Sequence, residues 1–111
     1  MDSIRGERPF FVVILTGPER GALRKEILKR ISKQQVRAVA EIAANVLFGA
    51  IGLSHRKRNL LKTIKPFLRS LSDQKSGPTV RKRIILSHPN ETFLLVRTVF
   101  KNLDELIWRA G

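Results

Sequence analysis

Cysteine and tyrosine are absent from this sequence, and tryptophan occurs once. Without cysteine the chain has no disulfide, no thiolate metal site and no cysteine nucleophile. Six phenylalanines and a 42% share of hydrophobic residues favour a folded, mainly aliphatic core and exclude a disordered basic tail. At 111 residues we expect a single basic helical domain over residues 1–111, with a flexible N-terminus over residues 1–9.

Residues that carry catalytic chemistry are also scarce. His55 and His88 are the only histidines, and neither has paired carboxylates near it in the sequence. The glycines do not form a phosphate-binding loop with its following lysine and serine or threonine. We therefore expect no catalytic residues, no metal site and no cofactor, so the chain is not predicted to be an enzyme.

Long apolar runs are missing as well. The six apolar residues 10–15 are too few for a signal-peptide core or a membrane span, and acidic residues precede them. The sequence therefore favours an intracellular protein over a secreted one, and a membrane partner is not favoured. The β-branched residues of this run permit a strand, but nothing else in the chain offers a pairing partner. We favour a short buried helix.

Cap residues followed by helical periodicity predict an all-α fold, a compact single-domain bundle of five to six short helices. Thr16 and Glu19 have the spacing of a capping box before one such helix, and Ser32 and Gln35 have it before the next. Ser54 is the predicted cap of a third helix. Short polar connections between these segments fit a bundle of neighbouring helices.

The remaining helices follow from proline and from further caps. Because Pro66 lacks a backbone donor and crowds the preceding turn, we expect the helix after Ser54 to kink or break near Lys65. Residues 79–86 are predicted to form a short basic helix. Asn90 is the predicted cap of the last helix, whose apolar stripe ends at Trp108.

Positive charge is the strongest feature of the composition. The chain carries 22 Lys and Arg against nine Asp and Glu, a net charge of +13. Residues 54–86 hold ten of these cations and one acid, a net +9, whereas residues 87–111 are neutral. A protein that tolerates this much self-repulsion usually meets a polyanion, so we expect an anionic macromolecule as its partner.

Four of these cations recur with helical spacing. Arg58, Lys62, Lys65 and Arg69 fall on one helix face, as a straight stripe about 16 Å long if the helix continues past Pro66. A solvated face usually mixes charges of both signs, and no carboxylate interrupts this one. With the neighbouring cations, the predicted nucleic-acid-binding residues are Arg56, Lys57, Arg58, Lys62, Lys65, Arg69, Arg81, Lys82 and Arg83.

Contact with phosphate is the predicted mode of binding. Six to eight such contacts would make log affinity fall with log salt at a slope of roughly −5 to −7. No helix groups Asn, Gln and Arg at an exposed first turn for reading base edges, and aromatic side chains for stacking are few. We therefore predict a non-catalytic nucleic-acid-binding protein without sequence preference.

Several stretches share a pattern with a known family: EIAANVLFG at residues 41–49, LRSLSD at residues 68–73 and RKRIIL at residues 81–86. Over residues 20–88 the chain resembles small basic proteins encoded in Polinton (Maverick) elements and adintovirus-like viruses of animals. This resemblance implies a virus- or transposon-associated protein of the nucleus or a virion, a DNA-binding or virion-core component. It therefore favours DNA over RNA as the partner. The chain departs from the pattern at residues 90–110, which are amphipathic and charged where the family has a Gly-rich apolar tail.

A second interpretation of the sequence stays open. Bundles of short helices are also typical of protein-interaction and assembly modules, such as death-fold adaptors and minor capsid components. The C-terminal helix with Trp108 offers a face through which a homo-oligomer could form.

Overall fold

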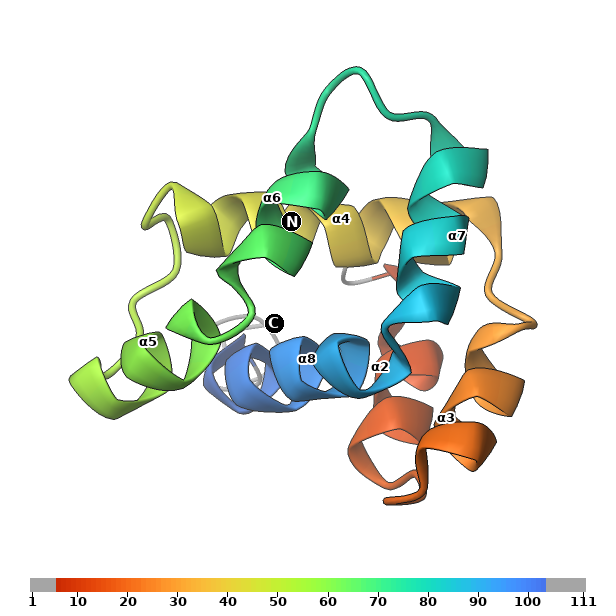
Figure 1. The fold of residues 1–111 in the computed structure, drawn as a ribbon. Helices are drawn as coiled ribbons and strands as arrows, with labels where there is room; N and C mark the ends of the chain where they lie inside the picture. The colour runs from red at the N-terminus through yellow and green to blue at the C-terminus, as the bar shows by residue number, and fades with distance from the viewer. Residues whose placement is uncertain (1–5, 104–111) are drawn as a thin grey trace.

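A computed structural model describes residues 6–103, apart from the side chains of residues 8 and 101–103. Over this range the chain is all-α and compact, without strands (Figure 1), which confirms the predicted class. The helices are α2 (Arg8–Leu15), α3 (Gly21–Leu28), α4 (Lys33–Leu47), α5 (His55–Lys62), α6 (Lys65–Ser72), α7 (Pro78–Ser87) and α8 (Pro89–Leu103).

The predicted number of five to six helices is wrong, because the described residues form seven. The difference comes from Pro66, which divides one expected helix into α5 and α6. α5 closes with a tight turn in which the Ile64 N–H donates to the Leu61 carbonyl oxygen, at 3.1 Å. Pro66 then occupies the first turn of α6, where its missing N–H costs no hydrogen bond. Figure 1 shows the chain changing direction at this point.

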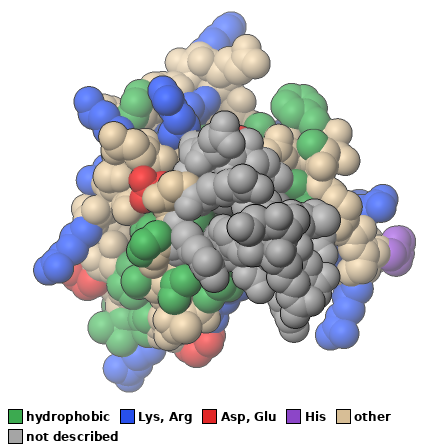
Figure 2. All heavy atoms as spheres, turned by 180° about the vertical axis from the view of Figure 1, so that it is seen from behind, with side chains coloured by type: hydrophobic (Ala, Val, Ile, Leu, Met, Phe, Trp, Pro, Cys, Tyr) green, Lys and Arg blue, Asp and Glu red, His purple; other side chains and the backbone are tan. Residues whose placement is uncertain are grey.

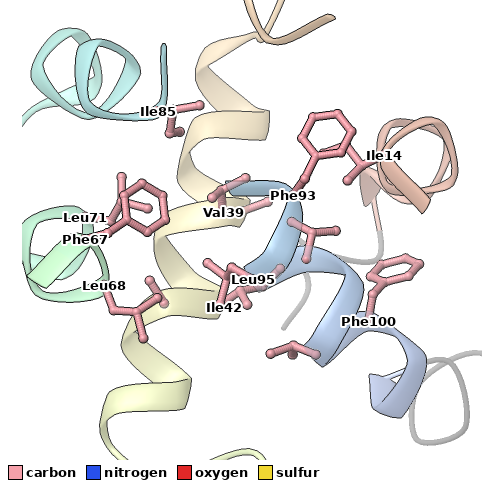
Figure 3. Close-up of a cluster of buried hydrophobic side chains, with 14 of the residues drawn as sticks. Ile14, Val39, Ile42, Phe67, Leu68, Leu71, Ile85, Phe93, Leu95 and Phe100 are labelled. Carbon is pink, nitrogen blue, oxygen red and sulfur yellow. The ribbon is translucent and has the colours of Figure 1, made fainter. Parts of the chain in front are cut away.

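The two 15-residue helices, α4 and α8, organise the core. In Figure 1 they cross the middle of the molecule one above the other, and α8 contacts α2, α3, α4, α5 and α7. α4 packs in addition against α6 and α7. The aliphatic and phenylalanine side chains between these helices are buried (Figure 3), and among them are Ile14, Val39, Ile42, Phe67, Leu68, Leu71, Ile85, Phe93, Leu95 and Phe100.

The N-terminal apolar run forms a helix, as predicted, but it is buried on one side only. Phe11 and Ile14 are fully buried, and the Phe11 ring lies 4.9 Å from the Phe100 ring of α8. Val12 and Val13 remain 43% and 47% exposed. Since α2 begins at Arg8, the last residues of the N-terminus expected to be flexible belong to a helix; residues 1–5 lie outside the described residues.

Two of the predicted helix caps are confirmed. The Ser32 Oγ accepts from the Gln35 N–H at 3.1 Å, and the Gln35 side chain accepts in return from the Ser32 N–H at 2.9 Å. Ser54 Oγ likewise accepts from the Lys57 N–H, at 3.2 Å. Each bond satisfies a backbone donor that a helix start leaves without a partner.

Two other predicted caps are wrong. The Thr16 hydroxyl donates backward to the Val12 carbonyl oxygen of α2, and α3 begins only at Gly21. Asn90 lies inside α8, and its side-chain oxygen accepts from Arg24 at 3.1 Å. In both cases the side chain makes its hydrogen bond with a residue outside the predicted capping sequence. The spacing of residues in the sequence does not reveal such a partner.

The last helix was expected to offer a face for oligomerisation. In the described residues α8 is instead the central helix of the core, with Phe93, Leu95, Val96, Val99 and Phe100 fully buried. The predicted extension of the apolar stripe to Trp108 lies outside the described residues. The homo-oligomer therefore stays a prediction. The described residues of α8 offer no exposed apolar face that supports it.

Candidate nucleic-acid interface

The nine predicted binding residues lie on three consecutive helices, α5, α6 and α7. Six of these side chains are exposed, and Lys57, Arg81 and Lys82 are half-buried. Within residues 6–103 none of the nine forms a salt bridge. Their charges are therefore not neutralised by any carboxylate that the structure describes, which leaves them available to an external anion.

Two carboxylates on the N-terminal side of the molecule are paired with other cations. Glu19 lies 2.9 Å from both Arg97 and Arg24, and Glu26 lies 2.7 Å from Lys29. The hydrogen bond and charge of Arg97, followed by the charge of Arg24, hold the pKa of Glu19 below its usual value. The hydrogen bond and charge of Lys29 lower the pKa of Glu26 in the same direction.

The straight stripe of four cations, expected only if the helix continued past Pro66, does not form, because the helix is broken at residues 63–64. The break replaces the stripe with a hollow. Arg58 and Lys62 from α5 and Lys65 from α6 line one pocket of about 310 Å³, whose apolar walls include Leu61 and Leu68. Arg69 does not line this pocket, although it is exposed on α6.

Backbone carbonyls, rather than acids, fix two of the arginines. Arg58 Nε donates to the Leu53 carbonyl oxygen at 3.1 Å, and Arg81 Nη2 donates to the Asp73 carbonyl oxygen at 2.9 Å. These bonds orient the guanidinium groups and leave their full positive charge. The second bond also ties α7 to the end of α6, so the two basic helices share one side of the bundle.

Sequence reasoning missed two cations of this side. Lys33 and Arg37 of α4 line a pocket of about 340 Å³ together with Arg81 of α7. Their spacing in α4 shows that they share a helix face, but the contact between α4 and α7 is a long-range one that the spacing alone does not predict.

The surface opposite the view of Figure 1 also carries many cations. Figure 2 shows Lys and Arg side chains projecting around much of the outline, with few Asp and Glu side chains between them. Positive charge is thus distributed around the molecule, and it is densest along the chain from α5 to α7, where Asp73 is the only acid.

The histidines take part in local contacts. His55 Nε2 lies 3.1 Å from the side-chain nitrogen of Asn59, and His88 Nδ1 lies 3.0 Å from the Ile84 carbonyl oxygen. Residues 6–103 contain no group of three or more His, Cys, Asp and Glu side chains able to hold a metal ion.

Comparison with known proteins gives no family for the chain. No protein-family model, curated protein or solved structure matches it. Within the described range, no helix has both the length and the apolar character needed to cross a bilayer. Function is therefore inferred from geometry and charge.

Proposed function

We propose that the protein binds nucleic acid through the phosphate backbone, without catalysis and without sequence preference. The observation that carries this proposal is the set of nine cations on α5, α6 and α7, none of which is salt-bridged within the described residues. Phosphate contacts by such side chains release condensed counterions, and this release supplies most of the affinity in non-specific binding.

The surface favours backbone contact over base reading. Phe48 is the one exposed phenylalanine among the described residues, and the exposed His55 and His88 lie at the start of α5 and the end of α7. The described residues therefore show no group of neighbouring aromatic side chains on which several bases could stack. Lysine and arginine side chains that project from three different helices suit the spaced charges of a backbone. The resemblance to Polinton and adintovirus proteins supports DNA as the partner and a role in a virus or transposon core.

Charge reversal at two exposed positions tests this function. Lys62 and Arg69 have no side-chain hydrogen bond within the described residues, so changing both to Glu should leave the fold intact. We expect the Lys62→Glu/Arg69→Glu variant to bind duplex DNA at least about tenfold more weakly, with the salt slope reduced by about two. Fluorescence anisotropy over a series of salt concentrations measures both quantities.

The matched control reverses two exposed cations elsewhere. Arg20→Glu/Lys25→Glu makes the same change in net charge next to α3, outside the proposed surface. This control should retain the wild-type salt slope, since only direct contacts release counterions. Equal effects of the two double variants, or no effect of either, would refute a binding surface on α5 to α7.

A protein-interaction or assembly module is the second candidate, and Phe48 favours it. This side chain follows α4 and is 80% exposed, and exposed aromatic rings are frequent anchors of protein interfaces. If this candidate is correct, nucleic-acid-free protein forms a defined oligomer in light scattering, and Phe48→Ser abolishes it. A monomer at all concentrations would exclude self-assembly.

A further inference from the structure

The first turns of α4 and α7 meet at a pocket that contains three cations. Its walls are formed by Lys33, Gln34, Val36, Arg37, Pro78 and Arg81, and its volume is about 340 Å³. This volume lies at the lower end of the range of small-ligand sites, which is about 300–1,000 Å³. No acidic residue lines the pocket, so three positive charges from two helices converge without compensation.

Backbone groups add to this positive potential. Both helices direct the positive end of their dipole to this region, since the pocket is lined by their first turns. The capping box of α4 uses the N–H groups of Ser32 and Gln35. The N–H groups of Lys33 and Gln34 make no hydrogen bond among the described residues, and such free donors at a helix start suit an anion.

A buried side-chain donor supplies an independent indication of a ligand. Arg81 Nε is buried and has no hydrogen-bond partner among the described residues, although Nη2 of the same guanidinium donates to Asp73. Buried donors in native proteins almost always have an acceptor. Arg81 lines the pocket and uses only Nη2 for a hydrogen bond within the described residues, and a guanidinium group with unused donors suits an oxyanion with several acceptor oxygens.

We propose that this pocket binds one phosphate group, held by Lys33, Arg37 and Arg81. The proposal deepens the proposed function and rests on it only for the source of the phosphate. That source is either a phosphodiester of a nucleic-acid backbone or a terminal phosphomonoester. It adds Lys33 and Arg37 to the binding surface and makes α4 part of the surface together with α7.

Titration with inorganic phosphate tests the pocket directly, with backbone amide shifts measured by NMR on the full chain. We expect saturable shifts in the first turns of α4 and α7. Lys33→Gln should weaken this binding about tenfold, since it removes one of three cations. Lys33 has no side-chain hydrogen bond within the described residues, so the variant should fold, and thermal unfolding followed by circular dichroism checks this.

Lys25→Gln is the matched control, because it removes the same charge from an exposed position on α3, outside the proposed surface. It should leave the phosphate affinity of the pocket unchanged. Shifts that do not saturate, that spread evenly over all basic helices, or that respond equally to both variants would overturn the proposal. Such a result would leave the proposed function standing if duplex binding is still strongly salt-dependent.

Two further ligands distinguish the sources of the phosphate. A thymidine dinucleotide with one internal phosphodiester represents the backbone, and thymidine 5′-monophosphate represents a chain end. Saturation by the dinucleotide assigns the pocket to backbone contact, and saturation by the monophosphate alone assigns it to a terminal phosphate. Shifts with inorganic phosphate but without salt-dependent duplex binding would support the pocket and refute the proposed function.

Discussion

At the scale of single residues, the sequence predicted the contacts that close within one helical turn. Ser32 and Ser54 cap their helices because donor and acceptor lie three residues apart in the chain. Thr16 and Glu19 have the same spacing, yet Glu19 pairs with Arg97, which lies far along the chain. The outcome at Glu19 depends on the docking of α8, and no local pattern contains that information.

Ser32 and Thr16 lead to different expectations for the loss of stability on substitution by alanine. Ser32→Ala should cost about 1 kcal/mol of unfolding free energy, because it removes the acceptor of the Gln35 N–H. Thr16→Ala removes only an exposed bond to a carbonyl, and should cost less than about 0.5 kcal/mol. Urea unfolding measures both. A larger loss for Thr16→Ala would contradict the assignment of the caps.

Glu19 makes the stability of the fold depend on pH. Because its arginine partners lower the pKa of the folded state below the usual value of 4.5, the ion pairs stabilise the protein above about pH 4.5. This contribution is lost as the pH falls through the lower pKa of the folded state. Since Glu19 is 83% exposed, the effect is small.

The variant Glu19→Gln isolates this contribution. Its melting temperature should lie below that of the wild type at neutral pH, and the two values should converge as the pH falls below about 4.5. Thermal unfolding followed by circular dichroism at a series of pH values gives the difference. A constant difference over the whole range would show that the charge of Glu19 is not involved.

At the scale of helices, a break near Lys65 was predicted from Pro66, whereas the direction of α6 after the break was not. That direction is set by packing, because Leu61 and Ile64 before the proline and Phe67 after it are all buried in the observed arrangement. The central place of α8 was also missed. Its stripe predicted an amphipathic helix, but contacts with α2, α3, α4, α5 and α7 depend on tertiary structure.

Replacing the proline tests what maintains the break. If packing of the buried seam determines it, Pro66→Ala keeps the wild-type helix content and loses about 0.4–1 kcal/mol, because the unfolded chain gains freedom. Far-ultraviolet circular dichroism and urea unfolding measure these quantities. Greater helicity with greater stability would mean that α5 and α6 merge into one rod once the proline is removed.

The central helix should be the element most sensitive to truncation. Phe93 of α8 is fully buried, and the guanidinium groups of Arg24 and Arg97 lie over its ring at 4.8 and 5.5 Å. Phe93→Ala should cost about 3–5 kcal/mol, whereas Val80→Ala at an exposed position of α7 should change stability by less than about 0.5 kcal/mol. Comparable losses in urea unfolding would refute a core centred on α8.

At the scale of the whole molecule, the sequence predicted where the positive charge lies along the chain. It did not predict how the charged side chains are arranged in space. The net +9 of residues 54–86 follows from counting. The break at Pro66 divides the cations of one expected helix between α5 and α6. The packing of α4 against α7 places Lys33 and Arg37 beside Arg81. Six cations therefore line two separate pockets, three in each, and the straight row does not form.

Salt dependence of duplex binding tests the central claim most directly. The wild-type protein is titrated into a short labelled duplex at several salt concentrations between about 50 and 200 mM, the range over which phosphate contacts lose most of their affinity. We expect log affinity to fall linearly with log salt, with a slope of roughly −5 to −7. No measurable binding at the lowest salt, or a slope near zero, would contradict phosphate-backbone recognition by the cations of α5 to α7.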